Sequence, residues 1–154
     1  MKTDNPQNVD LILLADDDVD DCMFFANAIE KLDLPIKLVS VHDGEAAMKW
    51  LNAAKKLPDI IFLDMNMPCK NGAECLAEIK EVERLKNIPI VIISTSLEDK
   101  LIKSLYENGA QWYIKKPNLF AHLKLLISNV IELVKKGNLQ IPTGEKFVLT
   151  VENK

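Results

Sequence analysis

Short apolar runs alternate with longer amphipathic segments along the chain. The runs cover residues 11–15, 37–41, 60–63, 90–93 and 112–114, and most are rich in leucine or β-branched residues. Such short apolar runs are typical of strands that are buried on both faces of a parallel sheet. The segments between them are long enough for a helix each. The pattern therefore predicts an α/β protein with five strands.

The order of the strands follows from general rules of chain connection. Repeated strand–helix units with short loops build a parallel sheet with helices on both faces. Right-handed crossovers and one reversal of winding give the order 2-1-3-4-5, which is the flavodoxin-like, doubly wound arrangement. In this arrangement a ligand crevice is expected beside strands one and three.

Two of the amphipathic segments carry an apolar stripe with helical spacing, and we expect both stripes to face the core. The first stripe consists of Phe24, Phe25, Ala28, Ile29 and Leu32, and the second of Phe120, Leu123, Ile127, Val130, Ile131 and Val134.

Five aspartates follow the first predicted strand within six positions: Asp16, Asp17, Asp18, Asp20 and Asp21. Asp18 can cap the helix that follows, and the helix dipole favours Asp20 and Asp21 in the first turn. Asp43 has the same position before the second helix. Helix initiation thus explains three of the five acids, and only the first two require another explanation.

Polar residues stand at the ends of the predicted strands. Asp16 and Asp17 follow the first, Asp64 the third, Ser94 the fourth and Lys116 the fifth. Because the carboxyl ends of parallel strands share one edge, these residues are expected to form a single site. Three carboxylates in a small volume repel one another unless a hard divalent cation neutralises them, and Mg²⁺ is the usual choice beside a phosphate. The pattern points to phosphoryl chemistry on a carboxylate.

Composition restricts the possible functions. The chain has 154 residues, a net charge of -4 and 48% hydrophobic residues, which suits one globular domain. Because no basic run is interleaved with aromatics, we expect no nucleic-acid partner. The N-terminus lacks an apolar signal and no stretch is long enough to span a bilayer, so no membrane contact and a cytoplasmic location are expected. The three cysteines lack metal-site spacing.

The domain organisation is expected to be simple. Residues 1–9 form an N-terminal tail, 10–136 the domain and 137–154 a C-terminal extension. In the extension, Pro142, Thr143 and Gly144 signal a turn before the apolar alternation of residues 147–151. A frayed terminus, an edge strand or hairpin, and a homodimer contact all remain open for this segment.

Four sequence motifs occur in the same order as in a known family. They are ILLADDD at 12–18, DIIFLDMNMP at 59–68 with Asn71-Gly72 after it, PIVIIS at 89–94, and KP at 116–117. Together they resemble the receiver domain of bacterial two-component response regulators, the CheY-like family. The resemblance covers about residues 10–136.

The resemblance implies a role for each residue at the predicted site. Asp64 matches the phosphoacceptor. Asp16, Asp17 and the main-chain carbonyl of Asn66 match the positions that hold Mg²⁺ together with Asp64, and Mn²⁺ can substitute. Ser94 and Lys116 match the residues that contact the phosphoryl group. Since Ser94 precedes Thr95 and Ser96, its assignment depends on register, and Thr95 is the alternative.

Four further assignments complete the resemblance. Tyr113 matches the aromatic switch residue that moves inward with the hydroxyl residue, although it can also simply cover the sheet edge. The side chains of Asn66 and Ser96 match positions that tune dephosphorylation. Pro117 matches a loop proline, for which the family implies a cis peptide bond after Lys116.

The expected function is that of a single-domain response regulator that signals through protein contacts. It accepts a phosphoryl group on Asp64 from a phosphohistidine of a sensor kinase or histidine phosphotransfer protein. A downstream partner is expected at the face formed by the fourth helix, fifth strand and fifth helix, and a homodimer is a further hypothesis. Catalysis is limited to the protein's own phosphorylation and dephosphorylation.

Three other functions remain as alternatives. A haloacid-dehalogenase-like phosphatase would also use Asp64 as nucleophile, but such enzymes usually carry a second Asp where this chain has Asn66. A flavodoxin-like cofactor binder is disfavoured because the acidic loop at 16–18 would repel a flavin phosphate. A pseudo-receiver that works without phosphate is disfavoured because all the reactive positions are present.

Overall fold

A computed structural model describes residues 8–137, 142 and 144–151 of the chain. In these residues a parallel sheet has the strand order β2-β1-β3-β4-β5-β6. The strands are β1 Leu11–Ala15, β2 Lys37–Val41, β3 Ile60–Asp64, β4 Ile90–Ser94, β5 Trp112–Lys115 and β6 Val148–Leu149. The helices are α1 Val19–Lys31, α2 Gly44–Ala53, α3 Gly72–Glu81, α4 Asp99–Glu107, α5 Phe120–Lys135 and α6 Gly144–Phe147. The predicted flavodoxin-like class and the order of the first five strands are confirmed.

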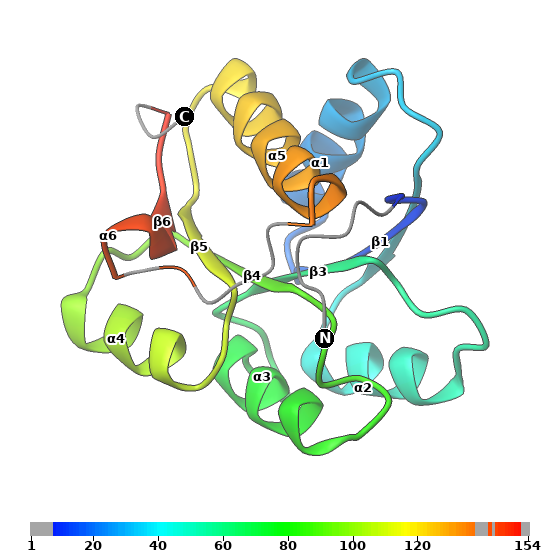
Figure 1. Cartoon of the computed structure of the whole chain (residues 1–154), viewed down its shortest axis with the longest axis vertical. Coiled ribbons are helices and arrows are strands. Elements are labelled where there is room, and N and C mark those ends of the chain that lie inside the picture. The colour runs from blue at the N-terminus through cyan, green and yellow to red at the C-terminus, as the bar shows by residue number, and fades with distance from the viewer. Residues whose placement is uncertain (1–7, 138–141, 143, 152–154) are drawn as a thin grey trace.

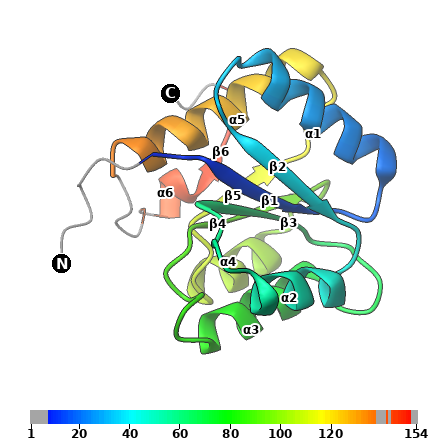
Figure 2. The same ribbon diagram turned by 90° about the vertical axis from the view of Figure 1, so that its right-hand side faces the viewer.

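The helices form a layer on each face of the sheet. Helices α1 and α5 pack together on one face, and α2, α3 and α4 cover the other (Figure 1). A view turned by 90° shows the sheet between the two layers (Figure 2). No helix in the described part of the chain is long and apolar enough to cross a membrane.

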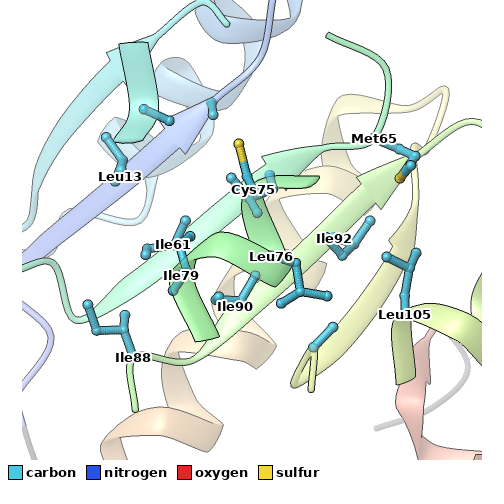
Figure 3. Packing of buried hydrophobic residues seen from close by; sticks show 14 of the residues in the cluster. Leu13, Ile61, Met65, Cys75, Leu76, Ile79, Ile88, Ile90, Ile92 and Leu105 are labelled. Atoms are coloured by element: carbon cyan, nitrogen blue, oxygen red, sulfur yellow. The ribbon is translucent and has the colours of Figure 1, made fainter. Parts of the chain in front are cut away.

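Alternating side chains of the strands pack into two hydrophobic cores, one on each face of the sheet. On the face of α2, α3 and α4, Leu76 and Ile79 of α3 pack on Ile61, Ile90 and Ile92 of the sheet (Figure 3). All five side chains are fully buried, and each is worth roughly 1.5–3 kcal/mol relative to an exposed position. The cores therefore hold the strand ends, and the polar residues on them, in fixed positions.

The predicted helix starts lie directly after the strands. The Asp18 carboxylate accepts hydrogen bonds from the amides of Asp20 and Asp21 at 2.8 and 3.1 Å, which makes it the N-cap of α1. Asp43 accepts a hydrogen bond from the amide of Ala46 at 2.7 Å and caps α2. These caps satisfy amides that have no partner within the helix. Both predicted caps are confirmed.

The first predicted core stripe is wrong at one position. Phe24 is 53% exposed, whereas Phe25 is 2% exposed and packs on Phe62 with ring centroids 4.9 Å apart. Successive helical residues differ by about 100° in direction, so Phe25 faces the sheet while Phe24 points to the side of the helix. Phe24 instead meets Phe120 of α5 edge to face, with 6.1 Å between ring centroids.

The sixth strand is the main departure from the expected five. Strand β6 pairs in parallel with β5, with Tyr113 opposite Val148 and Ile114 opposite Leu149. Val148 and Leu149 are successive strand residues and point to opposite faces of the sheet, where Val148 packs against the core that contains Phe147 and Leu149 is buried in the other core. Of the extension, residues 138–141, 143 and 152–154 lie outside the described residues, as do residues 1–7 of the N-terminal tail.

Candidate functional site

The acidic residues predicted to meet do meet at the carboxyl ends of the strands. Asp16 and Asp17 follow β1, and Asp64 is the last residue of β3. One carboxylate oxygen from each lies within 4.8 Å of the others. Asp16 and Asp64 are 3% and 4% exposed, whereas Asp17 is exposed to solvent. The acidic site thus has two buried carboxylates and one that is open to solvent.

Lys116, from the loop after β5, reaches into this acidic site. Its Nζ lies 3.3 Å from Oδ2 of Asp16 and 3.4 Å from Oδ1 of Asp64. A third carboxylate, that of Asp21, is its shortest partner at 2.8 Å. The neighbouring Lys115 is exposed. Lys116 is therefore the cation that the sequence predicted at the site.

Asp21 is a site residue that the sequence analysis missed. Its position in the first turn of α1 was assigned to the helix dipole alone. In the structure, α1 begins beside the site, so an acidic side chain in its first turn can reach Lys116. The proximity of the helix start to Asp16 and Asp17 was the available signal. The helix dipole and the ion pair act together at this position.

Burial and mutual repulsion raise the affinity of the buried carboxylates for protons. The pKa of Asp64 rises to about 7, chiefly because of burial and then because of the negative charge of Asp16, although Lys116 opposes the rise. Burial also raises the pKa of Asp16. For Lys116, burial alone would lower the pKa, but its bond to Asp21 and the neighbouring carboxylates raise it above its usual value. The site therefore carries negative charge that one lysine does not fully offset.

The donor set at the site fits a hard divalent cation. Carboxylate oxygens are the preferred protein ligands of Mg²⁺, which commonly uses only one or two of them with water and phosphate oxygens. The closeness of the Asp16, Asp17 and Asp64 oxygens, together with the raised pKa of Asp64, shows that a cation would relieve repulsion here. Asn66 stands two residues beyond Asp64 in the adjoining loop, and its side chain is exposed.

Ser94, Ser96 and Tyr113 form a hydrogen-bonded unit beside the acidic site. Ser94 ends β4 and is fully buried, and its Oγ accepts a hydrogen bond from the amide of Ser96 at 3.2 Å. The hydroxyl of Tyr113 donates to the main-chain oxygen of Ser96. Tyr113 is 0% exposed, and burial raises its pKa. Thr95, the alternative hydroxyl, is exposed.

Two loops complete the site. A Cβ on Gly72 would lie 2.6 Å from the main-chain oxygen of Asp64, so only glycine permits α3 to begin this close to β3. The expected cis bond before Pro117 is wrong, because the described residues contain no cis peptide bond. A trans bond is the default for a proline peptide, being favoured by about 0.5–1 kcal/mol.

Comparison with known proteins agrees with this geometry. The family model for the response regulator receiver domain matches residues 12–128. The probable methanogenesis regulatory protein FilR2 of Methanothrix harundinacea is 32% identical over 126 residues, covering 79% of this chain and 81% of that protein. Response regulator Rcp1 of Synechocystis sp. is 31% identical over 131 residues, covering 82% and 88%.

Solved structures of response regulators are similar to this chain as well. The phosphorylated cyanobacterial phytochrome response regulator RcpA superposes with a TM-score of 0.77 at 32% identity, covering 89% of this chain and 100% of that one. The Mn²⁺-bound form of Rcp1 superposes with a TM-score of 0.74 at 28% identity, covering 87% and 99%. Fold, motif order and these relatives agree that the chain belongs to the response regulator receiver domains, the phosphoacceptor signalling modules of two-component systems.

Proposed function

We propose that Asp64 is the residue that accepts the phosphoryl group. The observation that carries the proposal is the position of its buried carboxylate at the end of β3, within 4.8 Å of the oxygens of Asp16 and Asp17 and 3.4 Å from Nζ of Lys116. In the transfer, a carboxylate oxygen of Asp64 forms a bond to phosphorus. The bond between phosphorus and the donor's imidazole nitrogen breaks, and the imidazole leaves with the electron pair.

The residues proposed to hold Mg²⁺ are Asp16, Asp17, Asp64 and the main-chain carbonyl of Asn66, with Mn²⁺ as a substitute. The Mn²⁺-bound form of Rcp1, a structural relative, supports a divalent metal in this family. When bound, the cation neutralises the repulsion between the carboxylates and the anionic phosphoryl group.

The chain's own cation and hydroxyl have separate tasks. Lys116 is proposed to contact a phosphoryl oxygen, because its Nζ lies 3.4 Å from Oδ1 of Asp64. The buried hydroxyl of Ser94, rather than that of exposed Thr95, is proposed to donate to a second phosphoryl oxygen. The accessible side chains of Asn66 and Ser96 are proposed to tune how water reaches the acyl phosphate.

Intact mass after incubation with acetyl phosphate tests the chemistry. We expect the mass of one phosphoryl group to appear only when Mg²⁺ is present, and Asp64→Asn to abolish the gain. Asp59→Asn is the matched control, because Asp59 lies just before the same strand at its other end and accepts hydrogen bonds from the amides of Asp10 and Leu11. A gain that persists in Asp64→Asn would place the phosphoryl group elsewhere. Among phosphorylated proteins, Asn66→Ala and Ser96→Ala should change the phosphate half-life.

An apolar patch beside the site is the proposed docking surface for the phosphohistidine protein. Val19, Met23 and Phe24 of α1 are 62%, 59% and 53% exposed, and Leu119 before α5 is 58% exposed. The ring contact between Phe24 and Phe120 joins the two helices. Exposed apolar patches often mark protein contacts, and this one borders the helix start that carries Asp21. A donor bound here would lie close to Asp64.

A charge placed in the patch separates docking from chemistry. Met23→Glu should slow phosphoryl transfer from a phosphorylated histidine phosphotransfer protein at least tenfold, yet leave the reaction with acetyl phosphate unchanged. Asn52→Glu serves as the control, because it makes the same charge change at an exposed position of α2, on the other face of the sheet. Equal transfer rates for both variants would remove the patch from the proposal.

The remaining assignments concern organisation and output. Residues 10–136 are proposed as the receiver unit and 137–154 as an extension, in a cytoplasmic protein. A homodimer contact is proposed for the extension, and a downstream partner is proposed at the α4, β5 and α5 face. Because β6 and α6 already cover part of it, sedimentation of the protein with and without residues 137–154 tests the dimer.

A further inference from the structure

The chain's own C-terminal segment, residues 144–149, lies on the surface formed by α4 and β5. It forms α6 and β6, drawn in red, with β6 beside β5 at the edge of the sheet and α6 above α4 (Figure 1). Phe147 is 1% exposed and packs edge to face on Tyr106 of α4, with 5.2 Å between ring centroids. The hydroxyl of Tyr106 donates to the main-chain oxygen of Pro142 at 2.9 Å. Both ring packing and hydrogen bonding thus fix the segment to α4.

The same segment covers Tyr113. The ring of Phe147 lies 6.3 Å from that of Tyr113, and Val148 pairs with Tyr113 across the β5–β6 ladder. Without β6, β5 would be an edge strand of the sheet with open backbone groups. With β6 in place, Tyr113 is completely buried. An outward rotation of the Tyr113 ring would have to displace Phe147.

Tyr113 connects this contact to the acidic site. Its hydroxyl donates to the main-chain oxygen of Ser96, and the Ser96 amide donates to Oγ of Ser94 at 3.2 Å. A continuous series of contacts therefore runs from Phe147 through Tyr113 and Ser96 to Ser94, the residue proposed to touch the phosphoryl group. A ligand that binds only one of two conformations shifts the equilibrium toward it, and coupling between two such ligands is reciprocal.

We propose that residues 144–149 are an intramolecular ligand of the α4–β5 surface that binds only when Tyr113 is turned inward. Docking of this segment strengthens binding of a phosphoryl group at Asp64, and phosphorylation strengthens docking of the segment. The second half of this statement rests on the proposed function of Asp64 and Ser94. A partner that uses the α4–β5 surface must then either bind the docked segment or displace it.

The test compares Phe147→Ala with Leu149→Ala. Leu149 is a matched control because it belongs to the same segment and is 8% exposed, but it packs into the core on the α5 face, away from Tyr113. The first readout needs no phosphoryl chemistry: the NMR signals of the Tyr113 ring and of the Ser96 amide in the full chain. The second is the affinity for beryllofluoride, a phosphoryl mimic, in the presence of Mg²⁺.

Phe147→Ala should shift the Tyr113 and Ser96 signals and weaken beryllofluoride binding roughly fivefold or more. Leu149→Ala weakens docking of the segment but removes no contact with Tyr113, so its effect on both readouts should be clearly smaller. In the wild type, binding of beryllofluoride should slow amide exchange of Leu149. The factor of this slowing should equal the factor by which Phe147→Ala weakens beryllofluoride binding. Unchanged NMR signals in Phe147→Ala, or equal effects of both substitutions, would overturn the claim that the docked segment holds Tyr113 inward.

Two further outcomes separate the parts of the proposal. Shifted Tyr113 signals in Phe147→Ala without any beryllofluoride binding in the wild type would uphold the contact but reject both the coupling and the proposed function of Asp64. Signals that change on dilution of the wild type would show that the segment comes from a second copy, which overturns the intramolecular claim.

Discussion

Removing the charge of Asp64 should stabilise the metal-free protein at alkaline pH. Its carboxylate is buried and repelled by Asp16, so its pKa in the folded state is about 7, compared with an ordinary value of 3.8. The folded state therefore binds the proton more tightly than the unfolded state does. The free energy of unfolding falls as pH rises from about 4 to about 7, and is level above that range.

The size of the effect follows from the pKa. Only the part of the range from pH 5 to pH 8 that lies below the folded pKa of Asp64 contributes, which is roughly two pH units. In each of these units the free energy of unfolding of the wild type falls by about 1.4 kcal/mol. This gives an upper limit of about 3 kcal/mol. Since Asp64→Asn also loses the contact with Lys116, and since Asp16 titrates with Asp64, we expect about half of that. For a chain of this size it corresponds to a rise in Tm of about 3–6 °C.

Thermal unfolding in chelator at pH 5 and pH 8 measures the effect for wild type, Asp64→Asn and Asp59→Asn. The Tm advantage of Asp64→Asn over wild type should be larger at pH 8 than at pH 5 by this amount. Asp59→Asn should show no advantage at either pH, because the Asp59 carboxylate accepts two backbone hydrogen bonds. An advantage of Asp64→Asn that is the same at both pH values, or a loss at pH 8, would refute the reasoning.

Three other substitutions test the geometry of the site. Lys116→Met should tighten Mg²⁺ binding several-fold in calorimetry, because the ammonium within 3.4 Å of Asp16 and Asp64 no longer competes with the cation; weaker binding would contradict this. Tyr113→Phe should cost about 1 kcal/mol and speed amide exchange of Ser96, since the phenol no longer donates to the Ser96 oxygen; unaltered exchange would show the bond to be unimportant. Gly72→Ala should lower stability by about 1–3 kcal/mol in urea unfolding and slow phosphorylation by acetyl phosphate, because its Cβ would press on Asp64; a rate like that of wild type would contradict the close contact.

Much of the fold was predictable because the central strands β1, β3 and β4 are buried on both faces. Their apolar runs stand out from the amphipathic helices, and the order of the first five strands follows from connection rules. The meeting of Asp16, Asp17, Asp64 and Lys116 was predictable for the same reason: all four stand at the carboxyl ends of parallel strands.

The features that were missed depend on contacts between distant parts of the chain. Asp21 joins the site because of the direction in which α1 leaves the sheet, which no local pattern records. Phe24 lies outside the core because its position on α1 turns it toward Phe120 of α5, a contact between helices that are distant in the sequence. The alternation at residues 147–151 left an edge strand as one of several options, and the pairing of β6 with β5 could not be chosen among them because it joins residues more than thirty positions apart.

The central claim is that Asp64 carries the phosphoryl group, and the most direct test is to locate the group within the chain. Borohydride reduces an aspartyl phosphate to homoserine with release of phosphate, which marks the acceptor permanently. After phosphorylation with acetyl phosphate and Mg²⁺, borohydride treatment and tryptic digestion, fragment masses of the peptide spanning residues 57–70 should show homoserine at position 64 and unmodified Asp59. Homoserine at Asp16, Asp17 or Asp21 instead, with Asp64 unchanged, would contradict the account.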